Sequence, residues 1–188
     1  MPRTTAHLDA EQLRTLAHPL RMRLLAALRL HGPATATQLA QRLGSNSGKT
    51  SYHLRQLAAA GLVAEETERG DARDRWWRAS HASTSWNPAE HLDDPDAIAA
   101  ADWLAGHATR EHARWTDRFV QTRAQWSAAW IDASTLSDYQ LRLTPRRLRL
   151  LTEELGAVVE RYRQDTEDAD AEHVVVTIHA FPNPDPLA

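Results

Sequence analysis

Apolar residues recur every three or four positions near the start of the chain and predict two helices there. The first helix follows Asp9, whose side chain can cap it, with Gln12 three residues later. Pro19 interrupts the pattern and suits the first position of a second helix, because the N–H that proline lacks has no helical partner there. Glycine and proline at positions 32 and 33 end that second helix.

A second pair of helices is predicted on either side of a tight turn at Gly44. The first of the pair starts at a capping-box spacing, Thr35 with Gln38, and the second starts at Asn46 or Ser47 and ends near residue 60. In the second helix three residues at positions i, i+4 and i+7 form a predicted buried stripe: Thr50, Leu54 and Leu57. Two short helices joined by a glycine-containing turn indicate a helix-turn-helix.

After Gly61 the chain changes to strand-like segments. Residues 62–68 and 74–79 read as two strands around a turn at residues 69–73, so a β-hairpin, or wing, follows directly after the second helix of the pair. Alternation along the returning strand buries one of Trp76 and Trp77. The wing tip holds three arginines: Arg69, Arg73 and Arg75.

The second half of the chain is predicted to begin with a linker at residues 81–85 and a long helix from Pro95 to about Ile131. Aromatic residues at spacings of three and four form a stripe along that helix, and we assign four of them to a dimer interface: Trp115, Phe119, Trp126 and Trp130. The alternative is that the stripe forms a core, as such stripes usually do. A strand at residues 139–143, a helix from Pro145 to Tyr162 and a strand at residues 173–181 complete the pattern.

The predicted fold class is therefore α+β, mainly α: a winged helix-turn-helix domain followed by a long helix and a small strand-helix-strand appendage. We expect residues 1–82 to be the DNA-binding domain and residues 83–188 to be a dimerisation and effector region.

Two segments resemble ArsR-type winged-helix repressors: TQLAQRLGSNSGKTSYHLRQLAAAGLV and the earlier stretch Leu16-Ala17-His18-Pro19-Leu20-Arg21. The resemblance covers roughly residues 8–80. It implies a homodimeric DNA-binding repressor with contacts made by the first helix and by a helix after the wing. Many members of that family sense metals through cysteine thiolates, and this chain has no cysteine.

Charge divides the chain in the same place as the elements do. The net charge is −3, but residues 1–80 carry +5 and residues 81–188 carry −8, so the front half is the part suited to a polyanion. No apolar run approaches a membrane span, no secretory signal is recognisable at the N-terminus, and we expect a cytoplasmic protein without a membrane partner.

The predicted DNA-binding residues lie off the buried stripe and on the wing. They are Asn46, Ser47, Lys49, Ser51, Tyr52, Arg55, Arg69, Arg73 and Arg75. Polar residues at the start of a recognition helix reach base edges and phosphates, and wing arginines reach the backbone or a narrow minor groove. His53, beside the stripe, is expected to pack rather than to read a base. The alternative for all of them is an ordinary solvated surface.

The sequence predicts no enzyme, no cofactor and no metal site. There is no phosphate-binding glycine loop or nucleophile motif, and the ten histidines show no recognisable metal spacing. The sequence leaves open whether a small-molecule effector binds in a pocket lined by tryptophan side chains. We expect a sequence-specific transcriptional regulator whose partners are double-stranded DNA and a second copy of the chain; the alternative is a winged-helix module that binds another protein.

Overall fold

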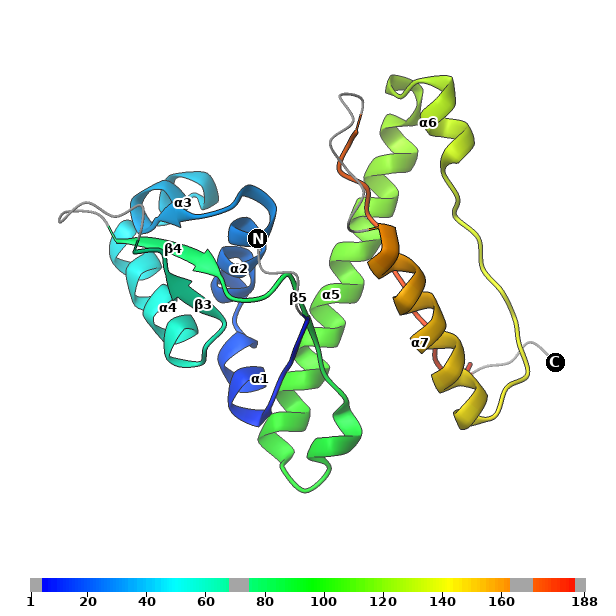
Figure 1. The fold of residues 1–188 in the computed structure, drawn as a ribbon, viewed down its shortest axis with the longest axis horizontal. Helices are drawn as coiled ribbons and strands as arrows, with labels where there is room; N and C mark the ends of the chain where they lie inside the picture. Colours follow the sequence, from blue (N-terminus) through cyan, green and yellow to red (C-terminus); the bar gives the residue numbers. More distant parts are fainter. Residues whose placement is uncertain (1–4, 68–74, 163–170, 185–188) are drawn as a thin grey trace. The chain divides into compact units, whose positions relative to one another are not determined.

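A computed structural model describes residues 5–67, 75–162 and 171–184 of the chain (Figure 1). It divides into two compact units, Met1–Arg114 and Trp115–Ala188. Every buried side chain among the described residues lies in the first unit.

Four helices of the first unit begin where the sequence predicts them. They are α1 (Ala10–Leu16), α2 (Pro19–His31), α3 (Ala36–Leu43) and α4 (Ser47–Ala59). Capping boxes start α1 at Asp9 and α3 at Thr35, because in each the side chain and the residue three positions later satisfy each other's free N–H groups. Gly44, at φ 63°, ends α3 in the left-handed conformation that glycine adopts without strain.

The wing is a three-stranded antiparallel sheet in the order β2-β4-β3, built from β2 (Ala34–Thr35), β3 (Val63–Glu65) and β4 (Trp76–Ala79). Trp77 lies opposite both Ala34 and Glu65 and is 5% exposed, whereas Trp76 is half-buried. The alternation predicted for the two tryptophans is confirmed. The predicted turn at residues 69–73 lies outside the described residues.

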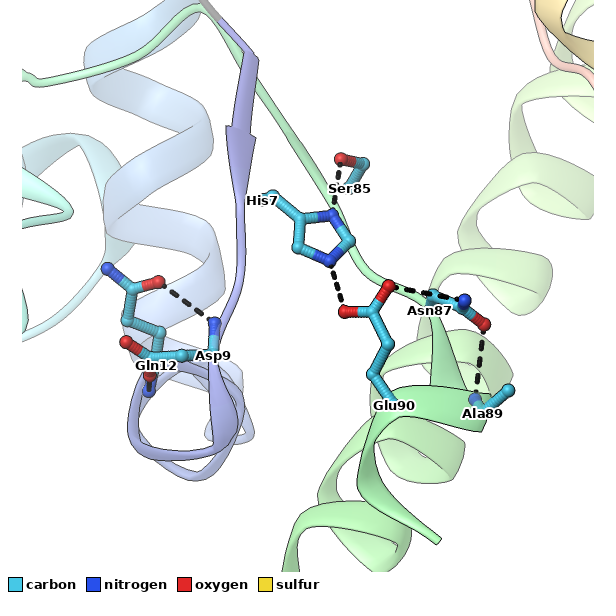
Figure 2. A network of polar contacts seen from close by, with 7 residues as sticks. All are labelled: His7, Asp9, Gln12, Ser85, Asn87, Ala89 and Glu90. Carbon is cyan, nitrogen blue, oxygen red and sulfur yellow. Dashed lines mark hydrogen bonds and ion pairs between the residues drawn. The ribbon is translucent and has the colours of Figure 1, made fainter.

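The N-terminal strand β1 (Thr5–His7) pairs in parallel with β5 (Ser83–Ser85), so the prediction of a linker at residues 81–85 is wrong. Leu8 donates its backbone N–H to the carbonyl oxygen of Ser85 at 2.8 Å, and its side chain is fully buried. The His7 ring contacts the Glu90 carboxylate at 2.7 Å, in the short 3-10 helix η1 (Pro88–His91) (Figure 2). These contacts hold the start of the chain against residues 83–91.

The core of the first unit is a single cluster of leucine and alanine side chains from α1 to α4, closed by Trp77 and by the first turns of α5 (Pro95–Thr122). Ala101 and Leu104 of α5 are each 1% exposed. The hydrophobic core of the winged domain therefore extends along the chain to Leu104.

The long helix predicted to residue 131 ends earlier, at Thr122, and this part of the prediction is wrong. A turn of 3-10 helix, η2 (Arg123–Gln125), and a short helix, α6 (Ala128–Ala133), follow it. Trp126 between them is extended, and the Ser127 hydroxyl accepts the N–H of Trp130 at 3.4 Å to start α6. A serine cap inside the pattern is a start signal that helical periodicity alone conceals.

The helix predicted from Pro145 is confirmed as α7 (Pro145–Tyr162). The two strands predicted at residues 139–143 and 173–181 are wrong, since the described residues there form no strand and are exposed. A strand needs a hydrogen-bonded neighbour, which alternation along one segment cannot guarantee. The predicted fold class, α+β and mainly α, is confirmed, but the sheet predicted for the C-terminal appendage does not form among the described residues. No described helix combines the length and apolarity needed to span a bilayer.

Candidate nucleic-acid interface

Helix α4 is fixed in the first unit by the stripe that the sequence predicts. Thr50, Leu54 and Leu57 are each 0% exposed, and α4 packs on both α2 and α3. The apolar side of α4 is therefore anchored in the core, which sets the direction in which its opposite side points.

The opposite side of α4 is polar and exposed. Five predicted DNA-binding residues lie on it or at its N-terminal end: Asn46, Ser47, Lys49, Tyr52 and Arg55. Ser51 is half-buried at the edge of this face, and Gln56, which the sequence analysis did not select, is exposed within it. We call these exposed residues, Gln56 included, the α4 face. It carries hydroxyl, amide and cationic groups, the types that contact base edges and phosphates.

The N-terminal end of α4 adds partial positive charge to this face, which favours an anion. The Asn46 side chain accepts the backbone N–H of Lys49 at 2.7 Å. The other N–H groups of the first turn have no helical partner, because no earlier turn precedes them. The N-terminal end of a helix carries partial positive charge and attracts phosphate. Asn46 and Ser47 therefore stand where a phosphate oxygen can be bound by backbone groups.

Acidic residues are absent from the whole segment that builds this surface. Residues 12–64 contain seven arginines and lysines and no aspartate or glutamate. That segment includes α2, α3 and α4, so no carboxylate from these helices neutralises the cations of the α4 face. Lys49 and Arg55 of α4 therefore keep their positive charge available to an anionic partner.

The described part of the wing is less cationic than its sequence suggests. The Arg75 Nε lies 3.3 Å from a Glu65 carboxylate oxygen, and the Arg78 Nε lies 3.4 Å from one of Glu66. These cross-strand pairs offset two of the wing's positive charges. Arg69 and Arg73 lie outside the described residues, so of the three predicted wing contacts only Arg75 is placed.

Two further residues from α2 and its cap border the α4 face and were not selected from the sequence. The ring of His18 lies against that of His53 with centroids 4.4 Å apart, and Arg21 lies one turn further along α2. Burial and neighbouring positive charge lower the pKa of both histidines. His53 packs, as predicted, but its partner comes from 35 positions away in the chain, and no local pattern signals such a contact.

The four residues predicted for a dimer interface lie on separate elements rather than on one continuous stripe. Trp115 and Phe119 are on α5, Trp126 follows η2, and Trp130 is on α6. The Trp126 and Trp130 rings meet edge to face at 6.2 Å, while Trp126 is 38% exposed. In the first unit, by contrast, Trp86 and Trp103 pack against the core, as a filled interior requires.

Among the described residues, no group of three or more His, Asp or Glu side chains is placed to hold a metal ion. The histidines of the second half therefore do not converge on a site in the part of the chain that the structure describes.

A helix pair around a left-handed glycine turn, followed by an antiparallel hairpin, with a basic, exposed second helix, defines a winged helix-turn-helix domain. This is a class of DNA-binding domain found in transcription regulators. Residues 16–66 match the family model described as "Helix-turn-helix domain". These residues therefore match a helix-turn-helix family model, and the resemblance to ArsR-type winged-helix regulators predicted from the sequence is confirmed there.

Solved structures similar to the chain include a possible transcriptional regulator for arsenical resistance, 28% identical, which covers 64% of this chain and 98% of its own with a TM-score of 0.33. The YusO protein from Bacillus subtilis is 15% identical over 62% of this chain and 81% of its own, with a TM-score of 0.34. The adhesin competence repressor AdcR from Streptococcus pyogenes is 15% identical over 79% of this chain and 83% of its own, with a TM-score of 0.35. A comparison with curated proteins found no match.

Proposed function

We propose that the chain is a sequence-specific transcriptional regulator, a dimeric repressor that inserts α4 into the major groove of double-stranded DNA. The observation that carries this proposal is the division of α4 into two sides. Thr50, Leu54 and Leu57 are fully buried, and the α4 face is exposed, basic and free of carboxylates. A helix anchored in this way presents a rigid polar surface to a groove.

The residues of the α4 face have different roles in this proposal. Arg55, near the C-terminal end of the face, can contact guanine with two hydrogen bonds, which gives about 1–3 kcal/mol of discrimination between bases. Lys49, near the N-terminal end, neutralises a phosphate and fixes the register of the protein on the duplex. Ser51 and the wing arginines Arg69, Arg73 and Arg75 contact the backbone or the adjacent minor groove.

A second copy of the chain is the proposed partner of the region after Leu104. The exposed apolar side chains of α7 include Leu155 and Val158, each 39% exposed, and α7 buries no residue in a single chain. Together with Trp115, Phe119, Trp126 and Trp130 they supply the apolar area that a homodimer buries. Two copies related by a two-fold axis would read an inverted repeat with half-sites about one DNA turn apart.

The test is fluorescence anisotropy with labelled duplex DNA, first of mixed sequence and then of a site selected by genome-wide footprinting with the purified protein. Phosphate contacts release counterions, so affinity should fall linearly with salt on logarithmic axes. Arg55→Ala should weaken binding to the selected site, and the triple change of Arg69, Arg73 and Arg75 to alanine should weaken binding to both duplexes. Arg146→Ala, on the exposed surface of α7, is the matched control.

Unchanged binding in both variants would show that DNA contacts another surface. Salt-insensitive capture of another protein, with no retention of DNA, would instead select the winged-helix protein-interaction module.

A further inference from the structure

Four basic side chains lie at the junction of α2 and α4, and three of them, His18, Arg21 and His53, have no role in the proposed function. His18 and His53 stack at 4.4 Å, Arg21 belongs to the same helix as the His18 cap, and Lys49 lies one turn before His53. We call these four residues the junction cluster. Their charges act on one another, since Arg21 and Lys49 both lower the pKa of His53.

The junction cluster lacks the anion that would balance it. The groups that shift the pKa of His18, Arg21 and His53 are other members of the cluster and Tyr52, and no carboxylate of a described residue is among them. The helices α1 and α3, which also pack on α2, add no acid to it. Arg21 and Lys49 are thus cations without a nearby carboxylate, beside two imidazoles that can gain charge, and this arrangement favours an anionic ligand.

Two polar atoms of the cluster are also left without partners. The Arg21 Nε and the His53 Nδ1 are buried and make no hydrogen bond to any described residue. Buried nitrogen atoms in that state are uncommon, because the lost hydrogen bonds to water are not replaced. Arg21 and His53 therefore keep hydrogen-bonding capacity that the described residues do not use.

The position of the cluster identifies the ligand class. Lys49 belongs both to the cluster and to the α4 face, and the Tyr52 ring, 56% exposed on that face, meets the His53 ring at 5.2 Å. An anion bound here would adjoin any duplex that the α4 face contacts, and the anion that a duplex offers at its edge is a backbone phosphate.

We propose that His18, Arg21, Lys49 and His53 form a binding site for a DNA backbone phosphate, and that His18 and His53 take up protons when the phosphate binds. The inference rests on the proposed DNA-binding function and adds a pH dependence to it. In the free domain burial and positive neighbours lower the pKa of both imidazoles and so favour their neutral forms. A phosphate beside them reverses the electrostatic balance and favours the charged forms.

Proton uptake makes the affinity depend on pH in a defined direction. Each proton gained on binding strengthens binding by at most about tenfold for each unit by which the pH falls. Between about pH 7.5 and 6 the wild-type protein should therefore bind a mixed-sequence duplex about fivefold to tenfold more tightly at fixed salt.

The experiment compares the wild type with a double variant, His18→Asn with His53→Gln. Asparagine can still accept the N–H of Leu20 as the His18 ring does, so the cap of α2 is kept while the titrating group is removed. His31→Gln, on the exposed C-terminal end of α2, is the control for a histidine outside the cluster. Anisotropy with the mixed-sequence duplex should show tightening at low pH in the wild type and control, and less than about twofold change in the double variant.

NMR titration of the histidine ring protons in wild-type protein provides a second measurement that does not depend on any variant folding. With DNA bound, the pKa of His18 and of His53 should rise above its value in the free protein. Equal pH dependence in wild type and double variant, or histidine pKa values unchanged by DNA, would overturn the phosphate site while leaving DNA binding intact. Absence of duplex binding at both pH values would overturn the proposed function and this inference together.

Discussion

The Asn46 side-chain oxygen accepts the backbone N–H of Lys49 at 2.7 Å, so one residue both starts α4 and stands at the edge of the surface proposed to meet DNA. Asn46→Ala removes the cap and should lower the free energy of unfolding by about 1 kcal/mol. Asn46→Asp keeps the cap and should leave stability close to wild type, but its negative charge should weaken duplex binding.

Chemical denaturation and anisotropy on the same preparations separate the two effects. Equal DNA affinity for Asn46→Asp and wild type would mean that the N-terminal end of α4 does not approach a phosphate.

Leu54 anchors α4 from the buried side, where it is 0% exposed. Leu54→Ala should lower the free energy of unfolding by about 2–5 kcal/mol, because it removes buried methyl groups and leaves a cavity. Gln56→Ala, on the exposed side of the same helix, should change it by no more than about 0.5 kcal/mol. Urea denaturation followed by circular dichroism gives both values; a small effect of Leu54→Ala would contradict the packing of α4 described above.

The ion pair between Glu65 and Arg75 in the wing should oppose DNA binding, because the Glu65 carboxylate offsets the positive charge of Arg75. Glu65→Gln should therefore strengthen binding to mixed-sequence DNA, and it should change stability little, since exposed ion pairs contribute at most about 1 kcal/mol. Glu154→Gln on α7 alters the net charge equally at a site outside the domain. If both variants gain the same affinity, the effect comes from net charge and not from the wing.

The lowered pKa values of His18 and His53 also predict how stability depends on pH. Because folding holds both below the ordinary value of 6.5, the unfolded chain binds protons that the folded chain does not. The stability of the free protein should fall as the pH is lowered from about 7.5 to 5.5. The pKa values of Glu90 and Asp94 are also lowered, from ordinary values of 4.5 and 3.8. Protonation of these carboxylates therefore affects stability only below the pH range in which the histidines titrate.

Thermal unfolding across this range should show a shallower slope for the His18→Asn, His53→Gln double variant than for the wild type. Parallel slopes would contradict the assignment of the effect to these two rings.

The proposed dimer predicts that a charge placed among the exposed aromatic residues separates the copies. Trp126→Glu should convert a dimer to a monomer in size-exclusion chromatography with light scattering, because a buried carboxylate without a partner opposes association. Gln125→Glu adds the same charge at the neighbouring exposed position and should remain dimeric. A wild-type monomer would contradict the proposed dimer, and a dimer in both variants would show that Trp126 lies outside its interface.

The sequence predicted the winged domain well because its signals are local. Caps at Asp9 and Thr35, the glycine turn at Gly44 and the stripe through Leu54 each depend on residues within one or two turns of one another. The α4 face follows directly from that stripe, since the exposed residues are those that the stripe leaves over.

Features that depend on distant residues could not be predicted in the same way. The pairing of β1 with β5 joins residues 78 positions apart, and the contact of His18 with His53 joins two helices. The opposite error occurred at Leu141 and Val175, where alternation predicted strands that have no neighbour to pair with. Local patterns specify an element only where tertiary packing also supplies its partner.

The most direct test of the α4 face is an NMR titration of the isotope-labelled, full-length protein with duplex DNA at low salt. The largest changes in backbone amide resonances should fall at residues 46–56, with a second group at residues 18–21. Changes confined to residues 115–162, or none at any duplex concentration, would contradict the claim that α4 binds DNA.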